Sequence, residues 1–239
     1  MKKALTQINW FRILFFYAAI LGATYLSRLL PNVLQIFLGY FTDTFFPWNY
    51  NHGIAVLLVT FVFYRFSKQK SHFSLLGNKK LKSLVFPLLL FAGYTIYGIS
   101  NHQGMDKHLW ALMFCGFTLV YDLMEEYAWR GYLIDELGKL AWAIKALISG
   151  VVWAVWHLLI FTDFDQFGGF GIFLLLCIVF SFLLTFSVVR TQSILVAATL
   201  HALLIKTNIV TLVLLIVFLV MLLTWNYSFE KLEKRRRVD

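Results

Sequence analysis

Eight apolar runs, separated by short polar stretches, constrain what this chain can fold into more than any other feature of its sequence. Crossing the hydrocarbon core of a bilayer takes about 20 residues of α-helix, and aromatic residues at the membrane interface can extend the shorter runs. The runs cover residues 13–27, 53–66, 84–100, 109–133, 141–162, 170–189, 193–206 and 208–226. We therefore predict an all-α, polytopic membrane protein, a bundle of about eight transmembrane helices forming a single domain over residues 1–239.

The composition argues against a soluble alternative. Hydrophobic residues make up 60% of the chain and charged residues 14%, against about 25% charged residues in a typical soluble domain. A chain this apolar cannot cover a water-facing surface, whereas it can face lipid on most of its helices. Between the first two runs, residues 29–41 carry apolar side chains at helical spacing, which predicts an interfacial or half-buried helix beginning at Pro31.

The net charge of +9 indicates membrane topology and not a nucleic-acid partner, because of how the basic residues are distributed. With eight crossings and a cytoplasmic N-terminus, 18 of the 21 lysines and arginines fall on the cytoplasmic side, the exceptions being Arg28, Lys107 and Lys206. We predict two cytoplasmic termini, with the basic C-terminal tail on the anionic inner leaflet; a partner-binding tail is the alternative. Arg12 interrupts the first run, so we expect no cleavable signal peptide, and a bacterial plasma membrane is the expected location.

Cysteine and serine chemistry finds little support in the sequence. Cys115 and Cys177 lie inside apolar runs without CxxC or CxxH spacing, so helix packing is their expected role. No Gly-x-Ser-x-Gly turn is present, which makes a serine protease the weaker interpretation.

Charged side chains near the end of the fourth run are the first candidates for chemistry, because ionisable groups in a membrane helix are costly and mark function by default. The segment contains Asp122, Glu125, Glu126 and Arg130. Glu126 and Arg130 are four residues apart and can pair on one helix face. Glu125 points about 100° away from Glu126, so it is hard for the same arginine to hold, and it is a candidate general base. The alternative is a group of charges that dips into the lipid headgroups.

Two of the six histidines, His157 and His201, lie within apolar runs. The others are expected in polar loops or at interfaces: His52, His72, His102 and His108. A lone membrane histidine usually hydrogen-bonds between helices. Two histidines beside Glu125, however, form a hydrolytic constellation in which the glutamate deprotonates water and the histidines orient that water or donate to an oxyanion. The same three residues are also a two-His, one-carboxylate set of the kind that ligates zinc in metallopeptidases.

At these residues the sequence resembles the CAAX prenyl protease and bacteriocin-processing family of intramembrane proteases, also called the Abi family. The first family motif, Glu-Glu-x-x-x-Arg followed by Gly, is matched by residues 125–131. The second, Phe-x-x-x-His, is matched by residues 153–157, with Trp153 replacing Phe. The third, His-x-x-x-Asn or Asp, begins at His201 but has Ile205 in place of the amide. The resemblance covers residues 109–208 approximately, in motif order and spacing.

The resemblance implies a glutamate-dependent endopeptidase with a water-filled cavity open to the cytoplasm. It implies a substrate in or at the membrane, such as a leader peptide, a bacteriocin or a signalling peptide. By motif position, Glu125 is the general base, Glu126 and Arg130 support it, His157 positions the water and His201 stabilises the oxyanion. No cofactor is required by this account; zinc bound by Glu125, His157 and His201 is the alternative.

The missing amide leaves the oxyanion site open to two interpretations. Asn208 follows His201 by seven residues, so it is a candidate oxyanion support on a similar helix face, or else a cap of the next helix. At 1.5 Å per residue His157 also lies deeper than Glu125, and a tilted or broken helix has to close that gap. The competing functions are a non-catalytic immunity or scaffold protein of the same family and, less favoured, a transporter with a proton relay.

Overall fold

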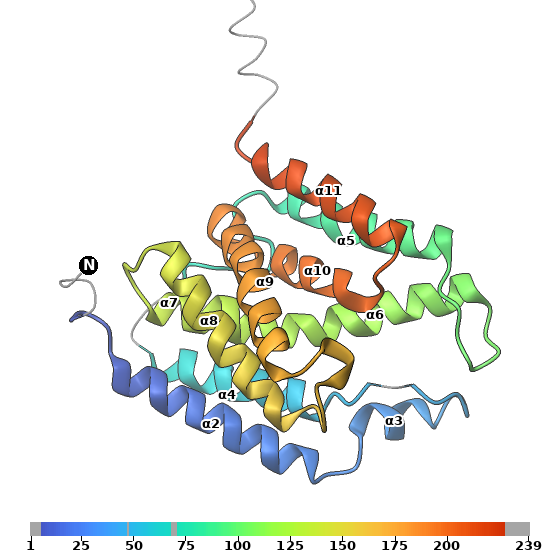
Figure 1. Cartoon of the computed structure of the whole chain (residues 1–239), viewed down its shortest axis with the longest axis horizontal. Coiled ribbons are helices and arrows are strands. Elements are labelled where there is room, and N and C mark those ends of the chain that lie inside the picture. Colours follow the sequence, from blue (N-terminus) through green and yellow to red (C-terminus); the bar gives the residue numbers. More distant parts are fainter. Residues whose placement is uncertain (1–5, 47, 68–70, 228–239) are drawn as a thin grey trace, which may run out of the picture.

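The computed structural model describes residues 6–46, 48–67 and 71–227, which fold mainly as helices (Figure 1). The longer helices within these ranges are α2 (Trp10–Arg28), α4 (Asn51–Phe66), α5 (Lys80–Tyr97), α6 (Lys107–Glu126), α8 (Trp142–Trp156), α9 (Phe170–Thr191), α10 (Ile194–Ala202) and α11 (Ile209–Leu223). Two short helices are α3 (Val33–Leu38) and α7 (Leu133–Glu136). The predicted all-α bundle is confirmed, and each apolar run corresponds to one of the longer helices.

Three segments among the described residues are long and apolar enough to span a membrane: α2, the stretch Trp142–Leu159 that contains α8, and α9. The helices α4 and α11 are apolar but shorter. Because α10 has 9 residues, it rises only about 14 Å, less than half of a hydrocarbon core of about 30 Å. The number of crossings and the side of each terminus therefore stay predictions. The basic tail predicted to contact the inner leaflet lies outside the described residues.

The helix predicted between the first two apolar runs is present but shorter than expected. It is α3, with 6 residues, and it is capped by Asn32, whose side chain accepts hydrogen bonds from the backbone N–H groups of Leu34 and Gln35. The expected start at Pro31 was therefore wrong by two residues. Leu34 and Leu38 are buried, whereas most of the other α3 side chains are exposed, which confirms a half-buried helix.

The end of α6 lies where two hydrophobic cores meet. One core joins α5, α10, α11 and much of α6. The other joins α2, α4, α8 and the turns that follow α6. The helices α8 and α9 run side by side in Figure 1 and pack closely at Gly150, where a Cβ atom would lie 2.7 Å from the Cα of Ile178. The candidate residues on α6 and α8 are thus placed inside the bundle.

The chain changes helix type after α6 and after α8, at two of the segments that carry candidate residues. After α6, residues Tyr127–Tyr132 form a π-helical turn, η1, which leads into α7. After α8, residues His157–Leu159 form a 3-10 turn, η2. Short π-helical insertions are rare and occur frequently at functional sites. The sequence requires a tilted or broken helix to bring His157 to the depth of Glu125. The structure shows a break, because α8 gives way to the 3-10 turn at His157.

Candidate active site

The structure brings the candidate residues together from four segments. Glu125 and Glu126 are the last two residues of α6, and Arg130 lies in the π-helical turn that follows. His157 begins the 3-10 turn after α8, and His201 lies near the end of α10. All five side chains are buried; Glu125 is 1% exposed, whereas His157 and His201 keep 8% and 9%. The small exposed surface of the cluster thus belongs mainly to the histidines.

Glu126 is engaged on two sides. Its Oε1 lies 2.9 Å from Nη1 of Arg130, so the ion pair predicted from the four-residue spacing is present, with both side chains fully buried. The same oxygen lies 2.9 Å from Nδ1 of His201, in an orientation that does not satisfy hydrogen-bond geometry. Arg130 is anchored further by Nη2, which donates a 3.3 Å hydrogen bond to Oγ of Ser181. Glu126 is therefore the tethered member of the glutamate pair.

Glu125 has different partners. Its Oε2 accepts a 2.8 Å hydrogen bond from Nε1 of Trp153, and the hydroxyl of Tyr121 interacts with the same carboxylate. Within the described residues no ion pair joins Glu125 to Arg130, as the 100° offset between adjacent helical side chains predicts. The two neighbouring glutamates are thus separated into one ion-paired carboxylate and one that receives neutral donors.

Trp153 connects the parts of the site, although sequence reasoning gave it no role beyond its place in a motif. The Cζ of Arg130 lies 4.6 Å from the centroid of the tryptophan ring, in cation–π contact. The ring of His201 meets it edge-on at a centroid distance of 4.9 Å. Phenylalanine, the usual residue of the motif, has no N–H to donate to Glu125. In the sequence, the replacement of Phe by Trp at position 153 is the feature from which this contact could have been predicted.

The backbone of Trp153 also fixes how His157 presents its ring. Nδ1 of His157 lies 2.8 Å from the Trp153 carbonyl oxygen, which only accepts hydrogen bonds, so Nδ1 carries the proton and Nε2 of the neutral ring has a free lone pair. No hydrogen bond to Nε2 of His157 or of His201 occurs within the described residues, and neither atom is fully enclosed. Both histidines therefore keep Nε2 available for water or a substrate.

His201 lies between two carboxylates. Besides Glu126, Oδ1 of Asp122 lies 3.8 Å from its Nδ1. Asp122 is buried, and its Oδ2 has no hydrogen-bond partner within the described residues. Positive charge on the His201 ring would therefore be stabilised from two sides.

His52 also belongs to this region, and it lies in a helix and not in the polar loop that was one of its two expected places. It is the second residue of α4 and is buried. Its Nε2 lies 2.6 Å from the hydroxyl of Tyr121, and its ring packs against Trp156. Because Tyr121 precedes Glu125 by one helical turn, α4 contributes a histidine that holds a neighbour of the candidate base.

Asn208 is not brought into the cluster. The chain leaves helical geometry after α10, and Asn208 caps α11: its Oδ1 accepts a 3.1 Å hydrogen bond from the backbone N–H of Thr211, within a capping box. The interpretation of Asn208 as oxyanion support therefore finds no support, because it assumed a continuous helix beyond His201. The side chain of Ile205 lies outside the described residues.

The alternative zinc ligands do not fit a metal site as they are arranged. Among the described residues, no group of three or more His, Cys, Asp or Glu side chains is placed to hold a metal ion. Oε2 of Glu125 accepts a hydrogen bond from Trp153, so this carboxylate is the ligand whose oxygen is already engaged. Peptide hydrolysis without a metal ion stays a prediction.

Comparison with known proteins agrees with the motifs. Residues 106–205 match the family model described as type II CAAX prenyl endopeptidase Rce1-like. No curated protein and no solved structure matches the chain. The matched segment contains every candidate residue except Asn208. The resemblance to the CAAX prenyl protease family is therefore confirmed over residues 106–205, which form the Rce1-like part of this membrane protein.

Proposed function

We propose that this protein is a glutamate-dependent intramembrane endopeptidase that cleaves a membrane-associated peptide or protein. The Rce1-like segment supports a CAAX-protease-like endopeptidase at the level of the family. The proposed dependence on Glu125 rests on one observation. Glu126 contacts Arg130 and His201, whereas Glu125 accepts a hydrogen bond from a neutral indole. A carboxylate that forms no ion pair with the described residues, in a cluster with two histidines whose Nε2 atoms are available, is suited to general-base catalysis.

The proposed reaction begins with a water molecule between Glu125 and His157. Glu125 takes one proton from the water while its oxygen forms a bond to the scissile carbonyl carbon, and the carbonyl oxygen becomes an oxyanion. His157 Nε2 accepts a hydrogen bond from the remaining O–H and so orients the attack. His201 donates from Nε2 to the oxyanion. As the C–N bond breaks, Glu125 passes its proton to the leaving amine.

Glu126 and Arg130 have a positioning role in this proposal. Arg130 holds Glu126 through its Nη1 and lies over the ring of Trp153, which donates to Glu125. Glu126 in turn contacts His201. One ion pair thus supports both the base and the oxyanion donor, without contacting the substrate.

Cleavage by the purified protein tests this function. Wild-type and Glu125→Gln protein, in the same detergent, are incubated with prenylated CAAX-type peptides and with unmodified leader-type peptides, and products are identified by mass spectrometry. We expect the wild type to cleave at least one class and Glu125→Gln to cleave none while unfolding at the same temperature. Equal cleavage by both proteins contradicts the proposal.

A second function, a non-catalytic immunity or scaffold protein, is favoured by the missing amide. Ile205 stands at the position of the family's Asn or Asp, and Asn208 is used as a helix cap. A scaffold would keep its function in cells when Glu125 is replaced by Gln, whereas a peptidase would lose it. The same variant therefore separates the two functions.

We also propose a multi-pass plasma-membrane topology with both termini cytoplasmic, in a bacterial cell. The support is the predicted distribution of 18 basic residues against 3 on the two sides. Reporter fusions at residue 105 and after residue 239 are expected to report opposite sides of the membrane. Readings from the same side contradict eight crossings.

We further propose that the reaction needs no metal, because a glutamate base and histidine donors can carry out the hydrolysis. Activity is then expected to survive treatment with a chelator. Zinc that purifies in stoichiometric amount, and that is lost and restored together with activity, contradicts this proposal.

A further inference from the structure

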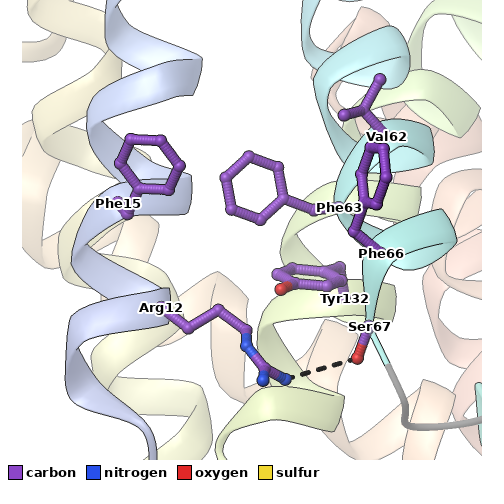
Figure 2. A pocket seen from close by; sticks show the side chains of 7 residues that line it. All are labelled: Arg12, Phe15, Val62, Phe63, Phe66, Ser67 and Tyr132. Atoms are coloured by element: carbon purple, nitrogen blue, oxygen red, sulfur yellow. Dashed lines mark hydrogen bonds between the residues drawn. The ribbon is translucent and has the colours of Figure 1, made fainter.

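A groove lies between α2 and α4, at the end of the bundle where α2 begins and α4 ends (Figure 2). Its volume is about 430 Å³, within the range of about 300–1,000 Å³ typical of small-molecule pockets. The residues that line it are Arg12, Phe15, Val62, Phe63, Phe66, Ser67 and Tyr132. None of them belongs to the acid and histidine cluster.

The wall of the groove is apolar and faces outward. Phe15 on α2 and Phe63 on α4 are in contact, with ring centroids 5.5 Å apart, and Phe66 at the rim is 83% exposed. Because α2 is apolar and long enough to span a membrane, this outer surface is one that lipid chains would meet. The wall therefore suits a hydrocarbon chain.

One end of the groove is polar, because Arg12 reaches across it from α2 toward the end of α4 (Figure 2). Nη1 of Arg12 lies 3.3 Å from Oε1 of Glu136 and 3.5 Å from Oγ of Ser67. These contacts with described residues use Nη1 alone, and the Arg12 side chain keeps 34% of its surface exposed. A guanidinium has five N–H donors in a fork that matches phosphate, so Nε and Nη2 are available to an anionic ligand.

A second polar group points to a ligand at the same place. Tyr132 lines the groove and is 1% exposed, yet its hydroxyl makes no hydrogen bond with the described residues. Glu136 interacts with this hydroxyl both electrostatically and as a hydrogen-bonding neighbour, although the two groups fall short of a regular hydrogen-bond geometry. Buried polar groups without a partner are rare in folded proteins and call for an explanation. An oxygen of a bound headgroup would supply the missing acceptor.

We propose that this groove binds an anionic phospholipid, with the phosphate at Arg12 and Tyr132 and one acyl chain along the phenylalanine wall. Free phosphate would leave the apolar wall unused, and a lipid without phosphate would leave the guanidinium and the phenol unused. The site is separate from the acid and histidine cluster and does not depend on the proposed peptidase activity.

Thermal unfolding of the full-length protein in a neutral detergent tests the proposal, because a ligand that binds only the folded state raises the unfolding temperature in a saturable way. The probes are dioleoyl phosphatidylglycerol, dioleoylglycerol, which lacks the phosphate, and inorganic phosphate, which lacks the chains. Only phosphatidylglycerol is expected to give a saturable increase. Equal saturation by dioleoylglycerol or by inorganic phosphate overturns the proposal.

The polar end is tested with the double variant R12Q/E136Q, which removes the guanidinium without leaving Glu136 charged and unpaired. Half-saturation by phosphatidylglycerol should then require roughly 10- to 100-fold more lipid, as expected for loss of a hydrogen bond to a charged group. Y132F keeps the ring and should weaken binding roughly 2- to 10-fold. Arg65 is exposed on the same helix as Phe63 but does not line the groove, so R65Q is the control and should bind as wild type.

The apolar wall is tested without touching the ion pair. V62W places a large ring in the groove and should abolish the saturable increase, whereas F61W, on a neighbouring exposed position outside the lining, should not. These variants keep the test decisive even if R12Q/E136Q fails to fold. Binding by V62W and Y132F at wild-type lipid concentrations overturns the proposal.

Discussion

The molecule uses the same ion pair, arginine with glutamate beside aromatic rings, in two places with different surroundings. At the candidate active site, Arg130 and Glu126 are 2.9 Å apart and both side chains are 0% exposed. At the end of the groove, Arg12 and Glu136 are 3.3 Å apart and Arg12 is about one-third exposed. The composition of the two pairs is therefore a poor guide to what each pair does.

The two ion pairs differ in how far their side chains are buried. Arg130 is covered by Trp153 and bonded to Ser181, so removing either partner of its pair leaves a charge inside the bundle. Arg12 is one-third exposed and can also meet water or a ligand, whereas Glu136 is 2% exposed, so this pair lies between an exposed and a fully buried ion pair. Even the sealed pair is incompletely satisfied, since Nε of Arg130 and Oε2 of Glu126 have no hydrogen-bond partner within the described residues. Such unsatisfied groups are expected at functional sites.

The largest expected effect comes from Glu125, which lies beside the buried pair but outside it. Glu125→Gln keeps the shape and can still accept from Trp153, but it removes the base, so cleavage should fall by about 10²–10⁴-fold. Thermal unfolding of the variant should match the wild type. Normal cleavage by Glu125→Gln, together with an inactive but well-folded Glu126→Gln protein, would reverse the roles of the two carboxylates.

Breaking the buried pair should affect folding before chemistry. Glu126→Gln or Arg130→Gln leaves an uncompensated buried charge, which typically costs about 3–5 kcal/mol. The double variant should cost less than the sum of the single variants, because each single change already removes the shared interaction. Denaturant unfolding in detergent measures both quantities. Additive costs would show that the pair does not act as a unit.

Trp153→Phe restores the residue of the family motif and should have a smaller effect. The aromatic face over Arg130 is kept, whereas the hydrogen bond to Glu125 is lost; a bond to a charged group is worth about 1.5–3 kcal/mol. We expect a fall in kcat of roughly 10-fold or more, with KM nearly unchanged. Unchanged kcat would mean that the indole N–H has no part in holding the base.

The eight helices could be predicted from sequence because long apolar runs leave the backbone no other way to satisfy its hydrogen bonds in lipid. The Glu126–Arg130 pair could be predicted because it depends on helical spacing alone. The contact from Trp153 to Glu125 spans 28 positions of sequence and depends on how α6 and α8 pack, which periodicity does not encode.

The buried position of His52 and the use of Asn208 as a helix cap instead of oxyanion support have a common cause, the local backbone. Asn49, Tyr50 and Asn51 give the start of α4 a polar, loop-like sequence. In the structure the Asn51 amide donates to one backbone carbonyl at the end of α2 and to two in the α2–α3 connection, so this polar start is buried and His52 with it. The seven-residue spacing places Asn208 on the same face as His201 only if one helix continues through both residues, but α10 ends at Ala202. Both outcomes depend on where helices stop.

The smallest effect is expected for the partly exposed Arg12–Glu136 pair. Arg12→Gln should lower the free energy of unfolding by less than Arg130→Gln does, because the guanidinium that it removes is one-third exposed and Oγ of Ser67 still donates to the buried Glu136 carboxylate. Arg130→Gln, with the same chemical change, should cost more, because both side chains of its pair are fully buried. At about 1 M salt the Debye length falls to about 3 Å, so the cost of Arg12→Gln should shrink further while that of Arg130→Gln stays. Measurements without added phospholipid keep ligand binding at the groove out of both numbers. Equal costs for the two arginines, or equal sensitivity to salt, would show that burial is not what separates the two pairs.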